Sequence, residues 1–304
     1  MIRALSIGLG ISTETLVGIE PQENSQMQKD EINWNEFPIK EMLARGWLQK
    51  LTNKTIQSTE ELVKGFIAGT GMQFGSAAFR RSISGDAYSP GTKHALYAWL
   101  ARVIQKAREK KQGLGKFDPN IFSTNFLREL AQLSWSDQGP AIAVEFLERN
   151  GIAVVIEPAL KGTLLDGAAL QDSDGTPIIG LTLRFDRLDN FWFTLIHEVA
   201  HLWKHVNHED MFLDNLDSSS EDRRELEANR IAKEALIPRV AWKRSDAYLN
   251  PSSESIDKLS RELKIHPAII AGRLRKEREN YTLFNELIGH HQVRKHFNLT
   301  GTEV

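Results

Sequence analysis

The chain has 304 residues, 41% of them hydrophobic, which is enough to bury a sizeable core. The 38 Lys and Arg residues nearly balance the 40 Asp and Glu residues, so the net charge of -2 excludes a global positive field that attracts nucleic acid or an anionic membrane. The absence of cysteine excludes disulfide scaffolds, thiol nucleophiles and thiolate metal sites. No apolar run approaches the roughly 18 residues of a membrane span, and no export signal is recognisable at the start, so we expect a cytoplasmic protein.

Two regions differ in their sequence pattern. Residues 1–112 are helix-like, with helical segments separated by clusters of Gly, Ser and Pro. The stretch GLGKFDP predicts a linker at residues 113–120, and residues 121–304 mix helical and strand patterns. We therefore expect a mainly helical N-terminal region followed by an α+β domain with a small sheet.

The second region carries the clearer pattern of elements. A short β-branched run suits a strand, two apolar runs around the turn-rich QDSDG predict a hairpin, and two long amphipathic stretches predict helices. In chain order, we expect helices at 121–133 and 140–148, strands at 152–156, 164–170 and 177–184, and helices at 191–206 and 221–236. The strand at 177–184 has two interpretations, an edge strand that pairs with a substrate peptide or an ordinary core strand.

The sharpest motif is TLIHEVAHLW at residues 194–203. His197 and His201 are four residues apart, so on a helix both imidazoles lie on one face and can bind one metal ion. Glu198 can then stand beside the ion as the general base of a hydrolytic reaction. The uncharged flanking residues predict a buried helix, where two imidazoles and a carboxylate without an ion are costly. The motif therefore predicts a zinc site.

A catalytic zinc ion takes three protein ligands, so one more is needed. His205 follows one turn after His201, but a straight helix does not wrap three successive turns around one ion. The segment RRELEANRIAKEALIP at 223–238 predicts a second helix with an apolar stripe, which both Glu225 and Glu227 flank. Helical geometry alone does not choose between these two glutamates.

The combination HEVAHLWKH, FLDN and ELEANRIAKEALIP resembles the ImmA/IrrE family of metallopeptidases, and the similarity extends over about residues 122–297. The resemblance implies a zincin-like fold of the gluzincin type and a Zn²⁺ cofactor. It assigns the third ligand to Glu227, the glutamate directly before Ala-Asn, so the expected set is His197, His201 and Glu227 with Glu198 as catalytic base.

Neighbouring residues are candidates for supporting roles. Asp214 is a candidate acceptor that orients a ligand imidazole, and Asn229 is a candidate hydrogen-bond partner near the site. A loop residue or a helix cap is the alternative for Asp214. We expect His205 and His208 to be exposed polar residues at the end of the helix.

Two segments have helix-turn-helix spacing. Residues 3–22 resemble the repressor-type domains that precede ImmA/IrrE domains in HigA-like antitoxins, and we expect a module trimmed at its start. Its recognition stretch is acidic, so we expect no tight binding of operator DNA. The second segment, at 259–277, ends in a basic tip that we interpret as a solvated helix face.

These patterns support two functions. The first is a cytosolic zinc-dependent endopeptidase that cleaves a regulatory protein, such as a repressor or a toxin partner encoded nearby. The alternative is a DNA-binding regulator or HigA-like antitoxin whose zinc domain is a sensor or inactive. The complete set of His197, Glu198, His201 and Glu227 favours the peptidase.

Overall fold

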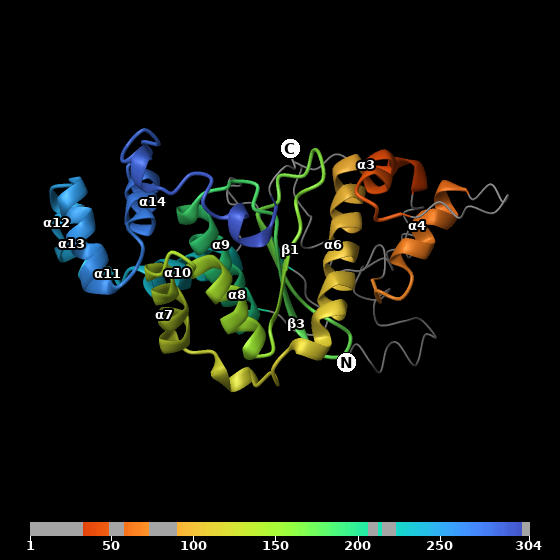
Figure 1. Ribbon diagram of the computed structural model, residues 1–304, viewed down its shortest axis with the longest axis horizontal. Coiled ribbons are helices and arrows are strands. Elements are labelled where there is room, and N and C mark those ends of the chain that lie inside the picture. The colour runs from red at the N-terminus through yellow and green to blue at the C-terminus, as the bar shows by residue number, and fades with distance from the viewer. Residues whose placement is uncertain (1–32, 49–57, 73–89, 206–211, 215–222, 300–304) are drawn as a thin grey trace, which may run out of the picture. The chain divides into compact units, whose positions relative to one another are not determined.

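The structure is a computed structural model, and it describes residues 33–48, 58–72, 90–205, 212–214 and 223–299. Helices dominate the described part, and they surround a four-stranded sheet (Figure 1). This arrangement confirms the expected α+β class with a small sheet.

The described elements follow the chain in a simple order. The helices are α3 (Ile39–Ala44), α4 (Thr59–Ile67), α6 (Pro90–Lys110), α7 (Thr124–Gln132), α8 (Gly139–Arg149), α9 (Leu188–Lys204), α10 (Arg223–Leu236), α11 (Arg239–Arg244), α12 (Asp246–Leu249), α13 (Ser253–Leu263) and α14 (Pro267–Glu277). The strands are β1 (Ala153–Ile156), β2 (Gly167–Gln171), β3 (Pro177–Leu181) and β4 (Phe212–Asp214). Short 3-10 helices lie at Trp34–Glu36, Lys111–Gly113, Pro119–Ile121, Leu133–Trp135, Asn285–Leu287 and Arg294–Phe297.

The sheet has the strand order β1-β3-β2-β4. Strands β2 and β3 pair antiparallel, with Gly167 opposite Leu181 and Gln171 opposite Pro177, which confirms the hairpin predicted around QDSDG. Its turn is closed by the Asp172 amide, which donates to the carbonyl of Thr176 at 2.8 Å. Strand β1 runs parallel to β3, and β4 runs antiparallel to β2.

Strand β3 lies inside the sheet, because it pairs with β1 on one side and with β2 on the other. All five of its residues are buried. The interpretation of this segment as a substrate-binding edge strand is therefore wrong, and the alternative of a core strand is correct. Its continuous run of apolar residues reflects burial on both faces, because only a half-exposed strand alternates apolar and polar residues.

Helices cover both faces of the sheet. Helix α6 lies along one face beside β1 and β3, while α8 and α9 lie on the opposite face (Figure 1). The contact with α6 is close at Gly180 of β3, where an added Cβ atom would lie 2.6 Å from the indole of Trp99. The Trp99 side chain is fully buried, and its indole N–H donates to the carbonyl of Glu157 at 2.9 Å. Glycine at position 180 thus lets the helix approach the strand.

The segment at 113–120 lies inside one compact unit, to which the described residues from Trp34 onward belong. Polar contacts add to the packing, because Lys106 pairs with Glu157 at 2.6 Å and Arg108 pairs with Asp172 at 2.6 Å. The composition change at 113–120 marks the passage from α6 to α7 within this unit.

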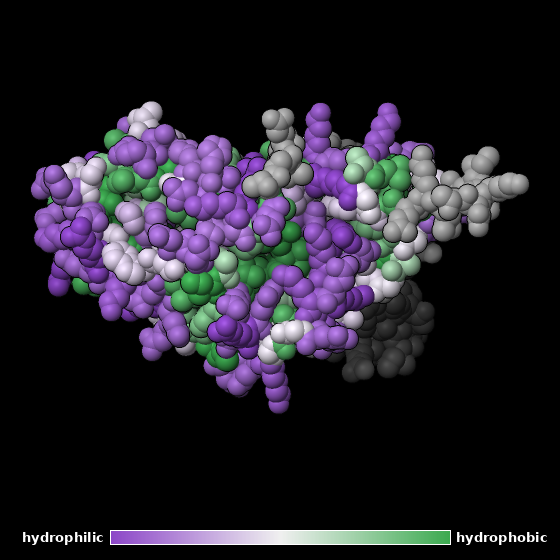
Figure 2. Space-filling view, viewed as in Figure 1, coloured by the Kyte–Doolittle hydropathy of each residue, from purple (hydrophilic) through white to green (hydrophobic). Residues whose placement is uncertain are grey.

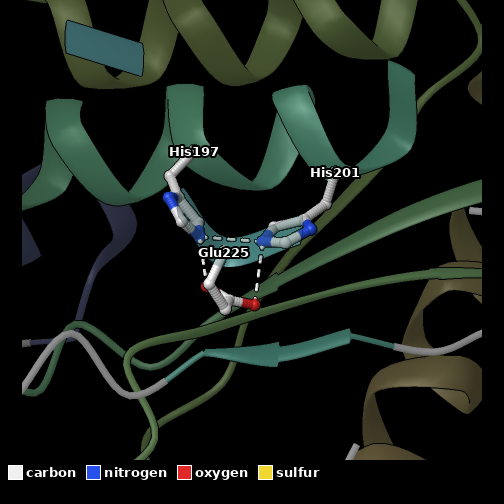
Figure 3. Close-up of side chains that lie close together, drawn as sticks. All are labelled: His197, His201 and Glu225. Atoms are coloured by element: carbon white, nitrogen blue, oxygen red, sulfur yellow. Dashed lines mark hydrogen bonds and ion pairs between the residues drawn. The ribbon is translucent and has the colours of Figure 1, made fainter. Parts of the chain in front are cut away.

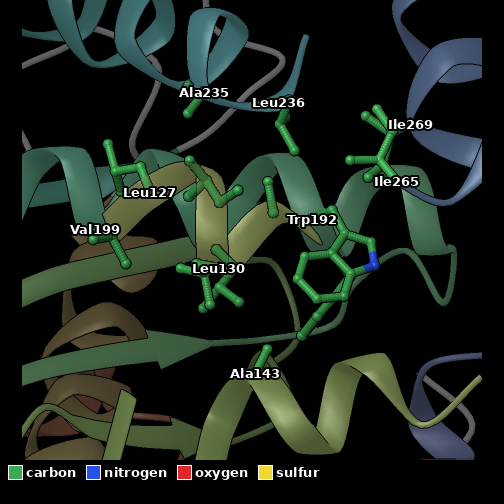
Figure 4. Close-up of a cluster of buried hydrophobic side chains, with 14 of the residues drawn as sticks. Leu127, Leu130, Ala143, Trp192, Val199, Ala235, Leu236, Ile265 and Ile269 are labelled. Carbon is green, nitrogen blue, oxygen red and sulfur yellow. The ribbon is translucent and has the colours of Figure 1, made fainter. Parts of the chain in front are cut away.

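The main hydrophobic core lies on the face of the sheet opposite α6. It joins side chains of α7, α8, α9, α10, α13 and α14 around the fully buried Trp192 (Figure 4). Helix α9 runs through this core, and twelve of its seventeen residues are buried. The core therefore fixes the helix that carries the HEVAH motif.

The visible surface is more hydrophilic than the core. Hydrophilic residues cover most of the face shown in Figure 2, and hydrophobic residues gather there in smaller areas. Among the described residues, no helix combines the length and the apolar character that crossing a membrane requires.

Candidate metal centre

Helix α9 brings the motif residues into the interior. His197, Glu198 and His201 are each fully buried, at 0% exposure. Their neighbours Leu195, Ile196, Val199 and Ala200 are apolar and also buried, so the polar groups are held in a low-dielectric environment. The four-residue spacing places the two imidazoles side by side, with their Nε2 atoms 2.9 Å apart.

Helix α10 supplies a carboxylate to this pair. Glu225 Oε2 lies 3.2 Å from His197 Nε2, and Glu225 Oε1 lies 3.2 Å from His201 Nε2 (Figure 3). Within the described part of the chain, these three residues form a group whose potential ligand atoms all lie within 4.8 Å of one another. The two helices pack along each other in the core, and this packing sets the convergence.

The third residue differs from the sequence-based assignment. The structure brings Glu225, and not Glu227, to the two histidines. Glu227 instead contacts His205, with Oε2 3.2 Å from Nε2. Both glutamates flank the apolar stripe of α10, and the packing of α10 on α9 decides which imidazole each one meets. Glu225 is therefore the glutamate placed to serve as third ligand.

Burial and mutual contact set the protonation of the site. Burial lowers the pKa of His201 to about 4, although the nearby Glu225 opposes this shift. Burial also opposes ionisation of Glu225, but contacts with His197 and His201 outweigh it and hold the pKa of Glu225 well below its usual range. At neutral pH the site thus offers a neutral His201 imidazole with a lone pair and an ionised carboxylate.

This set of atoms fits a zinc ion. Two imidazole nitrogens and one carboxylate are the ligands of many catalytic zinc sites, which keep a fourth position open. Bonds of about 2.0–2.1 Å in tetrahedral geometry place ligand atoms about 3.3 Å apart. The separations here, 2.9 Å between the imidazoles and 3.2 Å from each imidazole to the carboxylate, are close to that value.

Glu198 occupies a separate position on α9, beside the start of β2. An added Cβ atom at Gly167 would lie 2.4 Å from Glu198 Oε1 and 2.9 Å from the methyl group of Thr194. The glycine therefore makes room for the carboxylate. Gly167 was not among the residues predicted for the site, because its position at the start of a strand carries no sequence signal of contact with α9.

The structure tests the predictions for the residues around the site to different degrees. Asp214 lies on β4, opposite Gly167 in the strand register. Asn229 is half-buried on α10. The supporting roles of these two residues stay predictions. The prediction of an exposed His205 is wrong, because its side chain is only 6% exposed and contacts His201 and Glu227. His208 lies outside the described residues.

The basic tip at the C-terminal end of α14 comprises Arg273, Arg275, Lys276 and Arg278, of which Lys276 and Arg278 are exposed. Arg275 is buried and donates to Asn285 at 3.0 Å, and burial lowers its pKa. Arg273 donates to the carbonyl of Ile237 at 2.8 Å and pairs with Glu277. These two arginines are held by contacts within the helical end, so the interpretation as a solvated face is wrong for them and correct for Lys276 and Arg278.

An HExxH helix packed on a small sheet, with a carboxylate supplied by the next helix, defines a metallopeptidase-like domain. Residues 147–275 match the family model Peptidase_M78, described as the IrrE N-terminal-like domain. The matched range contains both histidines, Glu198 and both candidate glutamates, and it supports the resemblance to the ImmA/IrrE family. No curated protein and no solved structure gives a significant match. The helix-turn-helix resemblance at 3–22 lies outside the described residues.

Proposed function

We propose that the protein is a zinc-dependent endopeptidase that cleaves a regulatory protein in the cytosol. The observation that carries the proposal is the convergence of His197, His201 and Glu225 inside a region that matches a peptidase family model. His197, His201 and Glu225 are the proposed ligands, and Glu198 is the proposed catalytic base.

The division of roles follows from where the carboxylates lie. Glu225 contacts both imidazole Nε2 atoms, so it belongs to the group that would hold the ion. Glu198 lies on the same helix but is directed to the start of β2 at Gly167. The two carboxylates are therefore distinct in position, which suits one ligand and one base.

The chemistry would proceed through groups that the chain supplies. Bound zinc would polarise the scissile carbonyl and make a water molecule more acidic. Glu198 would accept one proton from the water as its oxygen attacks the carbonyl carbon. Glu198 would then donate this proton to the amide nitrogen as the carbon–nitrogen bond breaks, which releases a carboxylic acid and an amine; the acid then gives its remaining proton to the amine, so the final products are a carboxylate and an ammonium group.

The resemblance to the ImmA/IrrE family suggests the substrate class. We propose a repressor or a toxin partner encoded nearby as the substrate, recognised as a folded protein. We propose that such a partner docks on the part of the chain before the matched region, where the described helices α3 and α4 lie. If residues 3–22 bind DNA instead, the regulator function becomes the better explanation.

The first test is metal analysis of the purified full chain. Wild type is expected to carry one zinc ion per chain, and His201→Ala and Glu225→Gln are expected to lose most of it. Glu198→Gln is the matched control on the same helix, and it is expected to retain the metal. A wild-type zinc content near zero after mild purification would contradict the proposed site.

The second test is proteolysis. Wild type or Glu198→Gln is co-expressed with the products of neighbouring genes, and new N-termini are identified by mass spectrometry. Fragments that appear only with wild type would support the proposal. Equal fragment patterns from the two would refute the peptidase function, and sequence-selective binding of operator DNA at physiological salt would then favour the regulator.

A further inference from the structure

Beyond the proposed ligands, a chain of polar contacts leads outward from His201. His201 Nδ1 lies 3.1 Å from His205 Nδ1, and His205 Nε2 lies 3.2 Å from Glu227 Oε2. The exposed fraction rises along this chain, from 0% for His201 to 6% for the side chain of His205 and 42% for that of Glu227. The buried imidazole is thus connected to a carboxylate at the surface.

The contacts from His201 through His205 to Glu227 permit a consistent arrangement of protons. An imidazole that binds an ion through Nε2 must carry its proton on Nδ1, and a buried N–H group needs an acceptor. An acceptor within reach of His201 Nδ1–H is Nδ1 of His205, 3.1 Å away. His205 must then carry its own proton on Nε2, and this N–H group donates to Glu227. The carboxylate at the outer end thus selects the tautomer of both rings.

The position of Glu227 is itself supported. Its Oε1 atom lies 3.7 Å from Arg230 on the next turn of α10, which leaves Oε2 directed to His205. The same helix carries Glu225, which contacts His201 from the Nε2 side. Helix α10 therefore contacts the His201 ring directly through one glutamate and indirectly through the other.

We propose that His205 and Glu227 are positioning residues that fix the tautomer and the ring orientation of His201 for metal binding. The proposal rests on the proposed zinc site. Metal-binding histidines commonly donate their second N–H group to such a partner, and loss of the partner typically weakens metal affinity by about 10- to 100-fold. The proposal gives Glu227 a positioning role in place of a role as a metal ligand.

The test measures zinc affinity of the full chain by competition with a chelator. Glu227→Ala and His205→Phe are each expected to bind one ion per chain with about 10- to 100-fold lower affinity. The double variant is expected to bind no more weakly than His205→Phe alone, because Glu227 acts only through His205. Glu227→Gln is expected to recover part of the affinity, since its amide oxygen still accepts a hydrogen bond.

Controls separate this role from general effects on the helix. Glu234→Ala removes another exposed glutamate of α10 that accepts one hydrogen bond, from the amide of Arg239, and it is expected to keep wild-type affinity. Glu225→Ala is expected to lose more affinity than Glu227→Ala. The visible absorption of the cobalt-substituted protein is a second measurement, and it is expected to shift in Glu227→Ala but not in Glu234→Ala. His205→Asn replaces His205→Phe if circular dichroism shows that the latter is unfolded.

The possible results distinguish this proposal from the proposed function. Wild-type affinity in Glu227→Ala, or additive losses in the double variant, would overturn the positioning role while the zinc site stands. Complete loss of zinc in Glu227→Ala with retention in Glu225→Ala would make Glu227 the ligand and also overturn it. A wild-type chain that binds no zinc would refute the proposed site, and the positioning role with it.

Discussion

The contact between Gly167 and Glu198 leads to a quantitative prediction. A Cβ atom at position 167 would lie 2.4 Å from Glu198 Oε1, whereas ordinary contact begins at 3.4 Å. The carboxylate must therefore move by about 1 Å, and the methyl group of Thr194, 2.9 Å from the same Cβ, narrows the space on one side. A misplacement of about 1 Å in a catalytic group can lower the rate about 100-fold, equivalent to about 2.7 kcal/mol.

We therefore expect Gly167→Ala to lower kcat by about 100-fold on a cleaved substrate while it keeps one zinc ion per chain. We expect the metal to be retained because the three atoms nearest to the added Cβ belong to Glu198 and Thr194 and not to a proposed ligand. The assay is cleavage of a peptide that spans the site identified by co-expression, with zinc content measured on the same samples. Gly113→Ala is the matched control, because its Cβ would have no atom within 4 Å.

Two results would refute this reasoning. A Gly167→Ala variant with wild-type kcat would show that the carboxylate position at Gly167 is not the catalytic one. A variant that loses both zinc and activity would show that the added methyl group disturbs the whole site. Only loss of turnover with retained metal agrees with a base that is separate from the ligands.

Further predictions concern the same site and its support. Glu198→Gln is expected to keep zinc and the wild-type melting temperature but to lose turnover, measured by metal analysis, thermal unfolding and peptide cleavage. A chelator is expected to lower the melting temperature of wild type and not that of His197→Ala, because an ion that binds only the folded state stabilises it. Gly180→Ala is expected to lower the free energy of unfolding by about 1–3 kcal/mol in urea titrations without loss of zinc, because its Cβ would lie 2.6 Å from Trp99. Arg108→Met is expected to destabilise the protein at pH 7 by about 1.5–3 kcal/mol, since Arg108 makes two charged hydrogen bonds to Asp172. Burial opposes ionisation of Asp172, but the hydrogen bonds outweigh it and lower the pKa of Asp172 in the folded state. The stabilisation from the Arg108–Asp172 pair is therefore present above the unfolded pKa of about 3.9 and is lost as the pH falls through the lower folded pKa. Urea titrations at pH 7 and pH 3 are expected to show a smaller difference in the free energy of unfolding between wild type and Arg108→Met at pH 3.

The sequence predicted most of the local structure in the matched region. The hairpin, the strand β1 and the helices α8, α9 and α10 lie within a few residues of their expected positions, because turn residues and apolar periodicity act over short distances. The role of α6 was not predictable in this way. Its apolar residues indicated a helix, but nothing local indicated that Trp99 would pack against Gly180, about eighty positions later in the chain. This long-range contact places α6 in the same compact unit as the matched region.

The choice between Glu225 and Glu227 shows the same limit inside the site. At 3.6 residues per turn, two residues two positions apart point about 160° away from each other around the helix axis. The apolar stripe of Ala228, Ala232 and Ala235 runs between them, so each glutamate flanks one side of the surface that packs against α9. Which glutamate then meets His201 Nε2 and which meets His205 depends on the direction in which α10 crosses α9, and that direction is a property of the packed core. Local sequence therefore identifies both carboxylates as polar neighbours of the histidines, and tertiary packing divides them into a candidate ligand and a candidate positioning residue.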